Sequence, residues 1–184
     1  MVCIFNLVLS AVLIVGLPIL ISEVLGMSDT LYGFSQASLS LGGLCGGFLT
    51  AIVAEKLKLK NLYVLLLICS ASVFLMGISL LLGLSEIISY WVITLMCFVA
   101  MGVSTLFVVQ IYTVVQMQTP PELVGKIMAT LVSVAMCGQP IGQMIYGILF
   151  DVFSGNAWIV MLIASIASIL ITWYSRQVFK QLEY

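Results

Sequence analysis

Uncharged polar side chains interrupt the long apolar runs of this sequence. They are amides and hydroxyls, which donate and accept hydrogen bonds, so their chemistry is that of binding. Polar groups within apolar helices cost free energy unless they meet protein partners or a cavity. One such group alone fits a hydrogen bond between helices, but several arcs of them favour a shared cavity. The candidates are Asn6, Ser10, Gln36, Thr105, Tyr112, Gln116, Gln139 and Gln143.

Residue types that commonly perform catalysis are missing from these runs. The sequence contains no histidine, which excludes histidine-based catalysis and histidine metal ligands. The thiols fall inside apolar segments without any C-x-x-C pair, as buried packing residues do, at Cys3, Cys45, Cys69, Cys97 and Cys137. We therefore predict no enzymatic activity, no metal site and no cofactor.

The elements that carry the polar side chains are predicted from the charges. The chain has 184 residues, of which 63% are hydrophobic and 7% charged, and a soluble globule could not cover so much apolar surface. The charges fall in short clusters, and each run between them is long enough to cross a bilayer as a helix. The fold class is all-α, with six transmembrane helices in a single membrane domain over 1–184. The predicted helices are 2–22, 31–54, 62–83, 88–117, 127–150 and 157–176.

The basic residues predict the orientation. All of them fall in the second loop, the fourth loop and the C-terminal tail, at Lys56, Lys58, Lys60, Lys126, Arg176 and Lys180. The remaining loops hold acids without any basic residue. Because lysine and arginine mark the cytoplasmic side, we predict a multi-pass protein of the cell (cytoplasmic) membrane with both termini cytoplasmic.

A faint internal repeat appears when the sequence is shifted by half its length. Leu31-Tyr-Gly33 falls on Leu123-Val-Gly125, and Gly46 falls on Gly138. Each unit would hold three helices. Because three is an odd number, the second unit enters the membrane from the opposite side, which gives two inverted three-helix repeats. Inverted repeats are a device of secondary transporters, whose helices rock around a site near the bilayer midplane.

Small residues at helical spacing predict close helix packing. Gly43 and Gly47 lie on a small, polar stripe of the second helix, and Gly138 and Gly142 have the same spacing on the fifth. Residues without bulk at this spacing let two helix backbones approach closely. These glycines are our helix-packing candidates.

Three segments of the chain resemble a known family. The run Ala51-x-x-x-Glu55-Lys56-x-Lys58-x-Lys60 resembles the cytoplasmic signature of the major facilitator superfamily, with alanine, glutamate and Lys58 at its usual glycine, aspartate and second glycine. The segment 121–151, with Pro121-Glu122-x-x-Gly125-Lys126 and Gly138-x-Pro140-x-Gly142, is similar to the tenth-to-eleventh helix region of its macrolide-efflux-like branch. The segment 17–33 is similar to that branch's seventh helix. The resemblance covers the C-terminal half of a twelve-helix fold.

The resemblance implies a secondary active transporter that exports small amphipathic molecules. Its substrate path would be lined from the first and fourth helices by Asn6, Ser10, Thr105, Tyr112 and Gln116. The second-ranked candidates, from the neighbouring helices, would be Gln36, Gln139 and Gln143. Glu55, Lys56 and Lys126 would hold a cytoplasmic gate. The implied partners are the lipid bilayer, a small-molecule substrate and either an N-terminal six-helix half or a second copy, and no nucleic acid.

The length and helix count also fit a stand-alone six-helix substrate-binding subunit of an energy-coupling importer. Such a subunit needs outer loops that close over a pocket. The loops 23–30, 84–87 and 151–156 are too short to form a lid, which favours the transporter half.

Overall fold

The computed structural model describes residues 2–53 and 62–181, and all regular structure in this part of the chain is helical. Four short segments follow one another without a break and form the first span, Val2–Val24: α1 (Val2–Phe5), η1 (Asn6–Ser10), α2 (Ala11–Pro18) and η2 (Ile19–Val24). The other helices are α3 (Asp29–Val53), α4 (Leu62–Leu81), α5 (Glu86–Gln118), α6 (Val124–Val152) and α7 (Ala157–Gln181). Within the described residues, six helices are thus long and apolar enough to cross a membrane, which confirms the predicted fold class.

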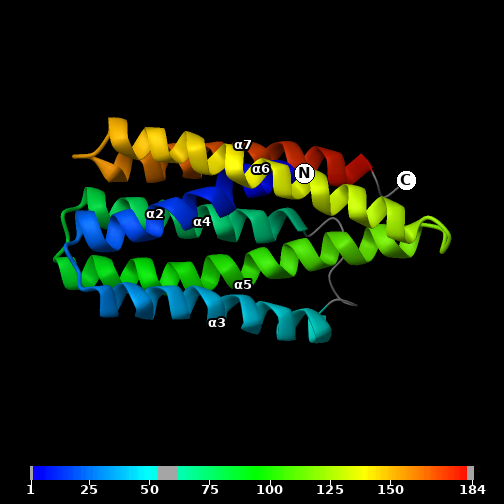
Figure 1. Ribbon diagram of the computed structural model, residues 1–184, viewed down its shortest axis with the longest axis horizontal. Coiled ribbons are helices and arrows are strands. Elements are labelled where there is room, and N and C mark those ends of the chain that lie inside the picture. The colour runs from blue at the N-terminus through cyan, green and yellow to red at the C-terminus, as the bar shows by residue number, and fades with distance from the viewer. Residues whose placement is uncertain (1, 54–61, 182–184) are drawn as a thin grey trace.

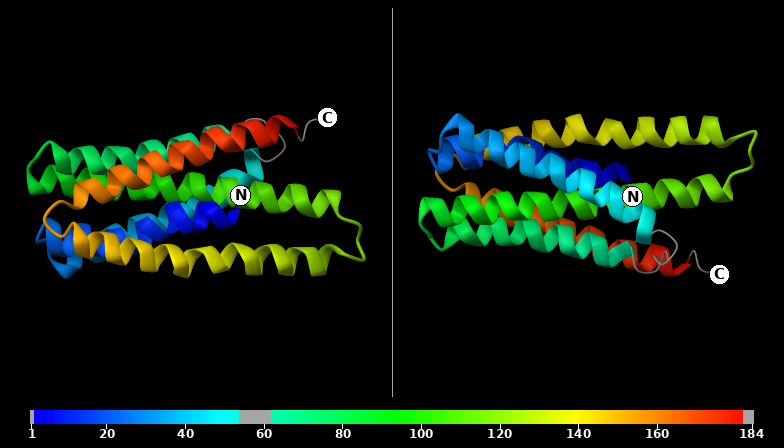
Figure 2. Two further views of the ribbon diagram at one scale, coloured as in Figure 1. Left: turned by 90° about the horizontal axis from the view of Figure 1, so that it is seen from above. Right: turned by 90° about the horizontal axis from the view of Figure 1, so that it is seen from below.

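The helices run along one common axis, and successive spans are antiparallel (Figures 1 and 2). Within the described residues, short turns join successive helices at the ends of the bundle, at 25–28, 82–85, 119–123 and 153–156. Gly26 follows the first span and Gly83 follows α4, with φ of 59° and 57°. Glycine adopts this left-handed conformation without a steric penalty, so both helices can stop within a tight turn. At the opposite end, α5 stops just before Pro120 and Pro121.

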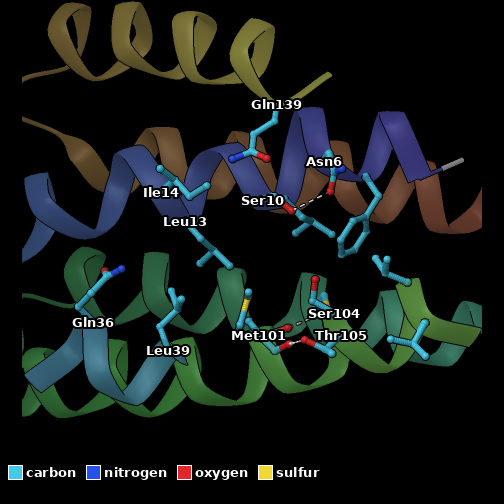
Figure 3. Close-up of a pocket in the computed structure, with 16 residues that line it drawn as sticks. Asn6, Ser10, Leu13, Ile14, Gln36, Leu39, Met101, Ser104, Thr105 and Gln139 are labelled. Atoms are coloured by element: carbon cyan, nitrogen blue, oxygen red, sulfur yellow. Dashed lines mark hydrogen bonds between the residues drawn. The ribbon is translucent and has the colours of Figure 1, made fainter. Parts of the chain in front are cut away.

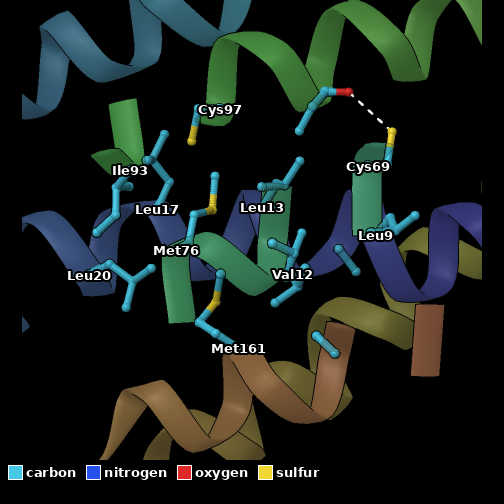
Figure 4. Packing of buried hydrophobic residues seen from close by; sticks show 14 of the residues in the cluster. Leu9, Val12, Leu13, Leu17, Leu20, Cys69, Met76, Ile93, Cys97 and Met161 are labelled. Carbon is cyan, nitrogen blue, oxygen red and sulfur yellow. Dashed lines mark hydrogen bonds between the residues drawn. The ribbon is translucent and has the colours of Figure 1, made fainter. Parts of the chain in front are cut away.

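The bundle interior is packed around the first span (Figure 4). Val12 and Leu20 of this span meet Met76 of α4, Ile93 of α5 and Met161 of α7, and each of these side chains is at most 1% exposed. Large apolar side chains also cover the outside of the bundle, as expected of helices that face lipid chains. The interior is therefore defined by tight packing rather than by a contrast between apolar inside and polar outside.

Close glycine contacts join α3 to α5. A Cβ atom added at Gly42 would overlap the backbone carbonyl of Phe98, and one added at Gly46 would overlap that of Gly102. The two helices run in parallel, side by side (Figures 1 and 2). Backbones can approach this closely only where no side chain intervenes.

The first span and α6 are joined in the same way. A Cβ at Gly138 would lie 2.5 Å from the carbonyl oxygen of Cys3, and one at Gly142 would overlap the carbonyl of Leu7. The contact between the second and fourth spans thus has a counterpart between the fifth and first spans. This correspondence is what two inverted three-helix units require.

The register of the repeat differs from the predicted one. The equivalent contacts pair Gly42 with Gly138 and Gly46 with Gly142, an offset of 96 residues in both cases. The sequence comparison had paired Gly46 with Gly138 instead. The difference is one helical turn, and successive small residues at i and i+4 make neighbouring registers look alike in the sequence.

The close contact on α3 also lies one residue away from the predicted position. Gly43 is in ordinary contact with Met101, and Gly47 has no atom within 4 Å of an added Cβ. Gly42 and Gly46 are the glycines that α5 requires. Overlapping Gly-x-x-x-Gly pairs have the same spacing, and only the position of the partner helix decides between them.

Candidate functional site

A cavity of about 470 Å³ separates the two glycine-packed helix pairs. Its wall comes mainly from the first span, α3, α5 and α6, with Cys69 added from α4 (Figure 3). Most of the lining is apolar, and none of the described residues that line it is charged. Its polar side chains from these four helices are Asn6, Ser10, Gln36, Ser104, Thr105 and Gln139.

The cavity brings together five of the eight predicted path residues, from four different helices: Asn6, Ser10, Gln36, Thr105 and Gln139. Tyr112, Gln116 and Gln143 are not among its lining residues. Tyr112 and Gln116 lie further along α5, where Tyr112 is half-buried and Gln116 is exposed. Gln143 lies half-buried on α6, one turn beyond Gln139.

Asn6 connects two helices. Its side-chain Nδ2 donates to the carbonyl oxygen of Ala135 on α6 at 3.0 Å, and its Oδ1 accepts from the Ser10 hydroxyl at 3.1 Å. The intervening backbone, η1, is a π-helical segment. Such wide turns are frequent at functional sites, and here the turn carries three cavity residues, Asn6, Leu9 and Ser10. Asn6 thus combines the two predicted roles, because it forms a hydrogen bond between helices and lines the cavity.

The hydroxyl of Thr105 is bonded within its own helix. It donates to the carbonyl of Met101 at 2.9 Å, while the side chain lies on the cavity wall. The sequence analysis missed its neighbour Ser104 and Cys69 of α4, both buried lining residues. Adjacency to Thr105 could have indicated Ser104. Cys69, which donates to Ala100 across 3.5 Å, carries no signal that distinguishes it from other packing thiols.

Gln36 and Gln139 face the cavity from opposite walls (Figure 3). Gln36 projects from α3 and Gln139 from α6. Neither side-chain amide forms a hydrogen bond with another residue that the structure describes, whereas the Asn6 amide and the Thr105 hydroxyl are bonded within the protein. Both glutamine amides can therefore bind another molecule.

The predicted gate can be placed only in part. Glu55 and Lys56 lie outside the described residues. Lys126 is exposed in the first turn of α6 and lines a second cavity of about 530 Å³, next to Val2 and Ile111. Among the residues that the structure describes, Lys126 forms no ion pair.

Comparison with known proteins decides the family. A model described as the Major Facilitator Superfamily matches residues 1–182. The chain belongs to the major facilitator superfamily. It is accordingly a membrane transporter, since this is a family of transporters and not of enzymes. Searches of curated proteins and of solved structures found no match.

The family match confirms the sequence resemblance at the level of the superfamily. The macrolide-efflux-like branch and the identity as one half of a twelve-helix protein stay predictions.

Proposed function

We propose that this major facilitator chain is the C-terminal six-helix half of a secondary active exporter of small amphipathic molecules. The observation that carries the proposal is the cavity between the two helix pairs. Its apolar wall suits a hydrophobic body, and its uncharged polar side chains suit a few hydrogen-bonding groups. Tyr112, Gln116 and Gln143 would extend the path beyond this cavity.

Uneven burial supports the need for a partner. In the most apolar window of each helix, 56% of the residues of the first span are buried, compared with 17% for α3 and 11% for α6. The outward faces of α3 and α6 include polar side chains such as Ser40 and Ser133, both exposed. Polar groups favour contact with protein over contact with lipid. An N-terminal half, or a second copy, would cover them.

The charges at the bundle ends support a cytoplasmic location for both termini. A turn connects antiparallel α6 and α7, so the start of α6 with Lys126 and the last turns of α7 with Arg176 lie at the same end (Figure 1). Lysine and arginine favour the cytoplasmic side. A gate of Glu55, Lys56 and Lys126 would then close the cytoplasmic mouth.

The experiment that tests this function is export of a hydrophobic dye, Nile red, from cells. Cells that express the chain together with a matching N-terminal six-helix half should accumulate less dye than cells that express either half alone. Purified chain, reconstituted as a monomer, should not move the dye against a gradient. Active transport by that monomer would overturn the half-transporter proposal.

The same cells test the importer alternative, which the family match does not separate from export. An importer subunit would raise uptake of its substrate and require an ATP-hydrolysing partner. Reduced accumulation that persists when ATP is depleted but an ion gradient is maintained fits the exporter. Increased uptake that is lost on depletion of ATP under a maintained gradient would favour the importer.

A further inference from the structure

The polar side chains of the cavity differ in how much of their hydrogen-bonding capacity the protein itself uses. Asn6 donates to Ala135 and accepts from Ser10, and the Thr105 hydroxyl donates within its own helix. These hydrogen bonds stabilise the wall of the cavity. The family resemblance ranked Asn6, Ser10 and Thr105 among the first candidates for substrate contact, but much of their hydrogen-bonding capacity is already used within the protein.

Gln36 and Gln139 differ from them. Each amide has a carbonyl acceptor and two N–H donors, and none of these groups has a partner among the described residues. The two side chains come from different helix pairs and point into the cavity from its two sides (Figure 3). Gln36 is exposed and Gln139 is half-buried, so both amides are accessible from the cavity and a ligand there could form hydrogen bonds with both of them.

The lining also constrains the charge of that ligand. Most of the remaining wall is formed by apolar side chains such as Leu9, Leu13 and Leu39, and no charged residue lines it within the described part of the chain. An ion that entered this space would lose hydration without meeting an opposite charge. A neutral molecule loses much less hydration free energy on entering the cavity. The volume of about 470 Å³ is in the range that accepts drug-sized ligands.

We infer that the cavity selects uncharged amphiphiles, and that the amides of Gln36 and Gln139 hold the hydrogen-bonding groups of the ligand from both sides. The inference rests on the proposed function, because it takes the cavity as part of the transport path. It narrows the substrate class to neutral molecules with an apolar body and several hydroxyl, amide or ester groups. It also makes Gln36 and Gln139, rather than Asn6 or Thr105, the residues that determine specificity.

Binding to the purified chain in lipid nanodiscs tests the inference without any transport step. The probes share a naphthalene body and differ in head group: naphthyl β-glucoside is neutral, naphthyl sulfate anionic and naphthylmethyl trimethylammonium cationic. Equilibrium dialysis should give a Kd for the glucoside at least about tenfold lower than for either ion. Equal or tighter binding of an ion, or no binding of the glucoside, would overturn the inference.

Variants test the two amides. Gln36→Leu and Gln139→Leu should each weaken glucoside binding about three- to tenfold, which corresponds to the loss of one hydrogen bond. Gln118→Leu makes the same chemical change at the exposed end of α5, away from the cavity, and should leave the Kd unchanged. Unchanged binding in both cavity variants would exclude the amides as ligand contacts.

A charge-changing variant covers the case in which the leucine variants fold poorly. Gln139→Glu preserves the shape of the side chain and places a carboxyl group in the wall. It should weaken glucoside binding and tighten binding of the trimethylammonium probe relative to the sulfate. An unchanged ratio of the Kd values for the two ionic probes would contradict the inference. Dye export by paired halves is a separate measurement, so failure of the charge preference and failure of the transport proposal can be distinguished.

Discussion

At the scale of single residues, the fold depends on glycines at the contacts between helices, where any side chain would prevent close packing. Gly42 and Gly46 bring α5 so close to α3 that any Cβ would meet a backbone carbonyl. A backbone cannot rotate away as a flexible side chain can. Gly47, on the same helix, faces open space. Glycines that look equivalent in the sequence therefore have opposite tolerance for substitution.

Alanine substitutions should reveal this difference. Gly42→Ala and Gly46→Ala should each destabilise the fold by about 1–3 kcal/mol, since overpacking forces the helices apart. Gly47→Ala should be neutral or slightly stabilising, because alanine favours the helix. Thermal unfolding in detergent, followed by size-exclusion chromatography, provides the comparison. If Gly47→Ala lowered the stability as much as Gly46→Ala, the assignment of Gly46 to the contact with α5 would be wrong.

The hydrogen bond from Asn6 to Ala135 also belongs to this scale. Replacing Asn6 with leucine keeps much of the side-chain volume but removes the bond between the first span and α6. Hydrogen bonds between membrane helices contribute about 0.6 kcal/mol on average and up to about 1.7. Asn6→Leu should lower the melting temperature, whereas Thr130→Val, which removes only a bond to Lys126 within α6, should change it less. Equal effects would mean that the bond does not stabilise the helix pair.

At the scale of the helices, α3 and α5 form a pair that is joined by more than glycine contacts. The hydroxyls of Ser35 and Thr94 lie 2.7 Å apart, and Tyr90 donates to the carbonyl of Leu31 at 3.0 Å. Contact between the two helix pairs includes Phe5 and Phe107, whose ring centroids are 5.2 Å apart. Polar bonds thus lie within this pair, and apolar packing connects it to the other.

A double-mutant cycle measures the bond between Ser35 and Thr94. Ser35→Ala and Thr94→Val should each destabilise the protein, and the double variant should lose less than the sum, with a coupling energy of about 0.6 kcal/mol. Ser40 is exposed and more than one helical turn from Ser35, so Ser40→Ala combined with Thr94→Val should be additive. The quantity to measure is the free energy of unfolding in mixed detergent. Strict additivity at Ser35 would exclude a stabilising bond.

The helices themselves could be predicted because lipid imposes a simple rule. Charge-free runs of sufficient length must form spans, so their number followed from the positions of a few charges. Helix rotation and register did not follow, as Gly43 in place of Gly42 illustrates. Likewise Ser104 and Cys69 were missed, since polarity patterns do not show which face of α5 or α4 meets the cavity. These details depend on the partner helix, which one sequence does not encode locally.

At the scale of the whole molecule, the bundle has two chemically different ends. Lys126 and Arg176 mark one end, where Arg176 lies 5.4 Å from the ring centroid of Tyr63 and so contacts α4 as well. Asp151 lies at the end of α6 that is opposite to Lys126. Basic residues are retained on the cytoplasmic side during insertion, so this asymmetry predicts that the end with Lys126 and Arg176 faces the cell interior.

Thiol labelling in intact cells tests the orientation. In a background with the native cysteines replaced by serine, an impermeant maleimide should label Asp151→Cys and leave Lys126→Cys unlabelled until the cells are opened. The two sites are exposed at opposite ends of the same helix, so each is the control for the accessibility of the other. Labelling of Lys126→Cys from outside, with Asp151→Cys protected, would show that the bundle has the opposite orientation in the membrane. The Lys126 mouth would then face outward, and a gate of Glu55, Lys56 and Lys126 could not be cytoplasmic.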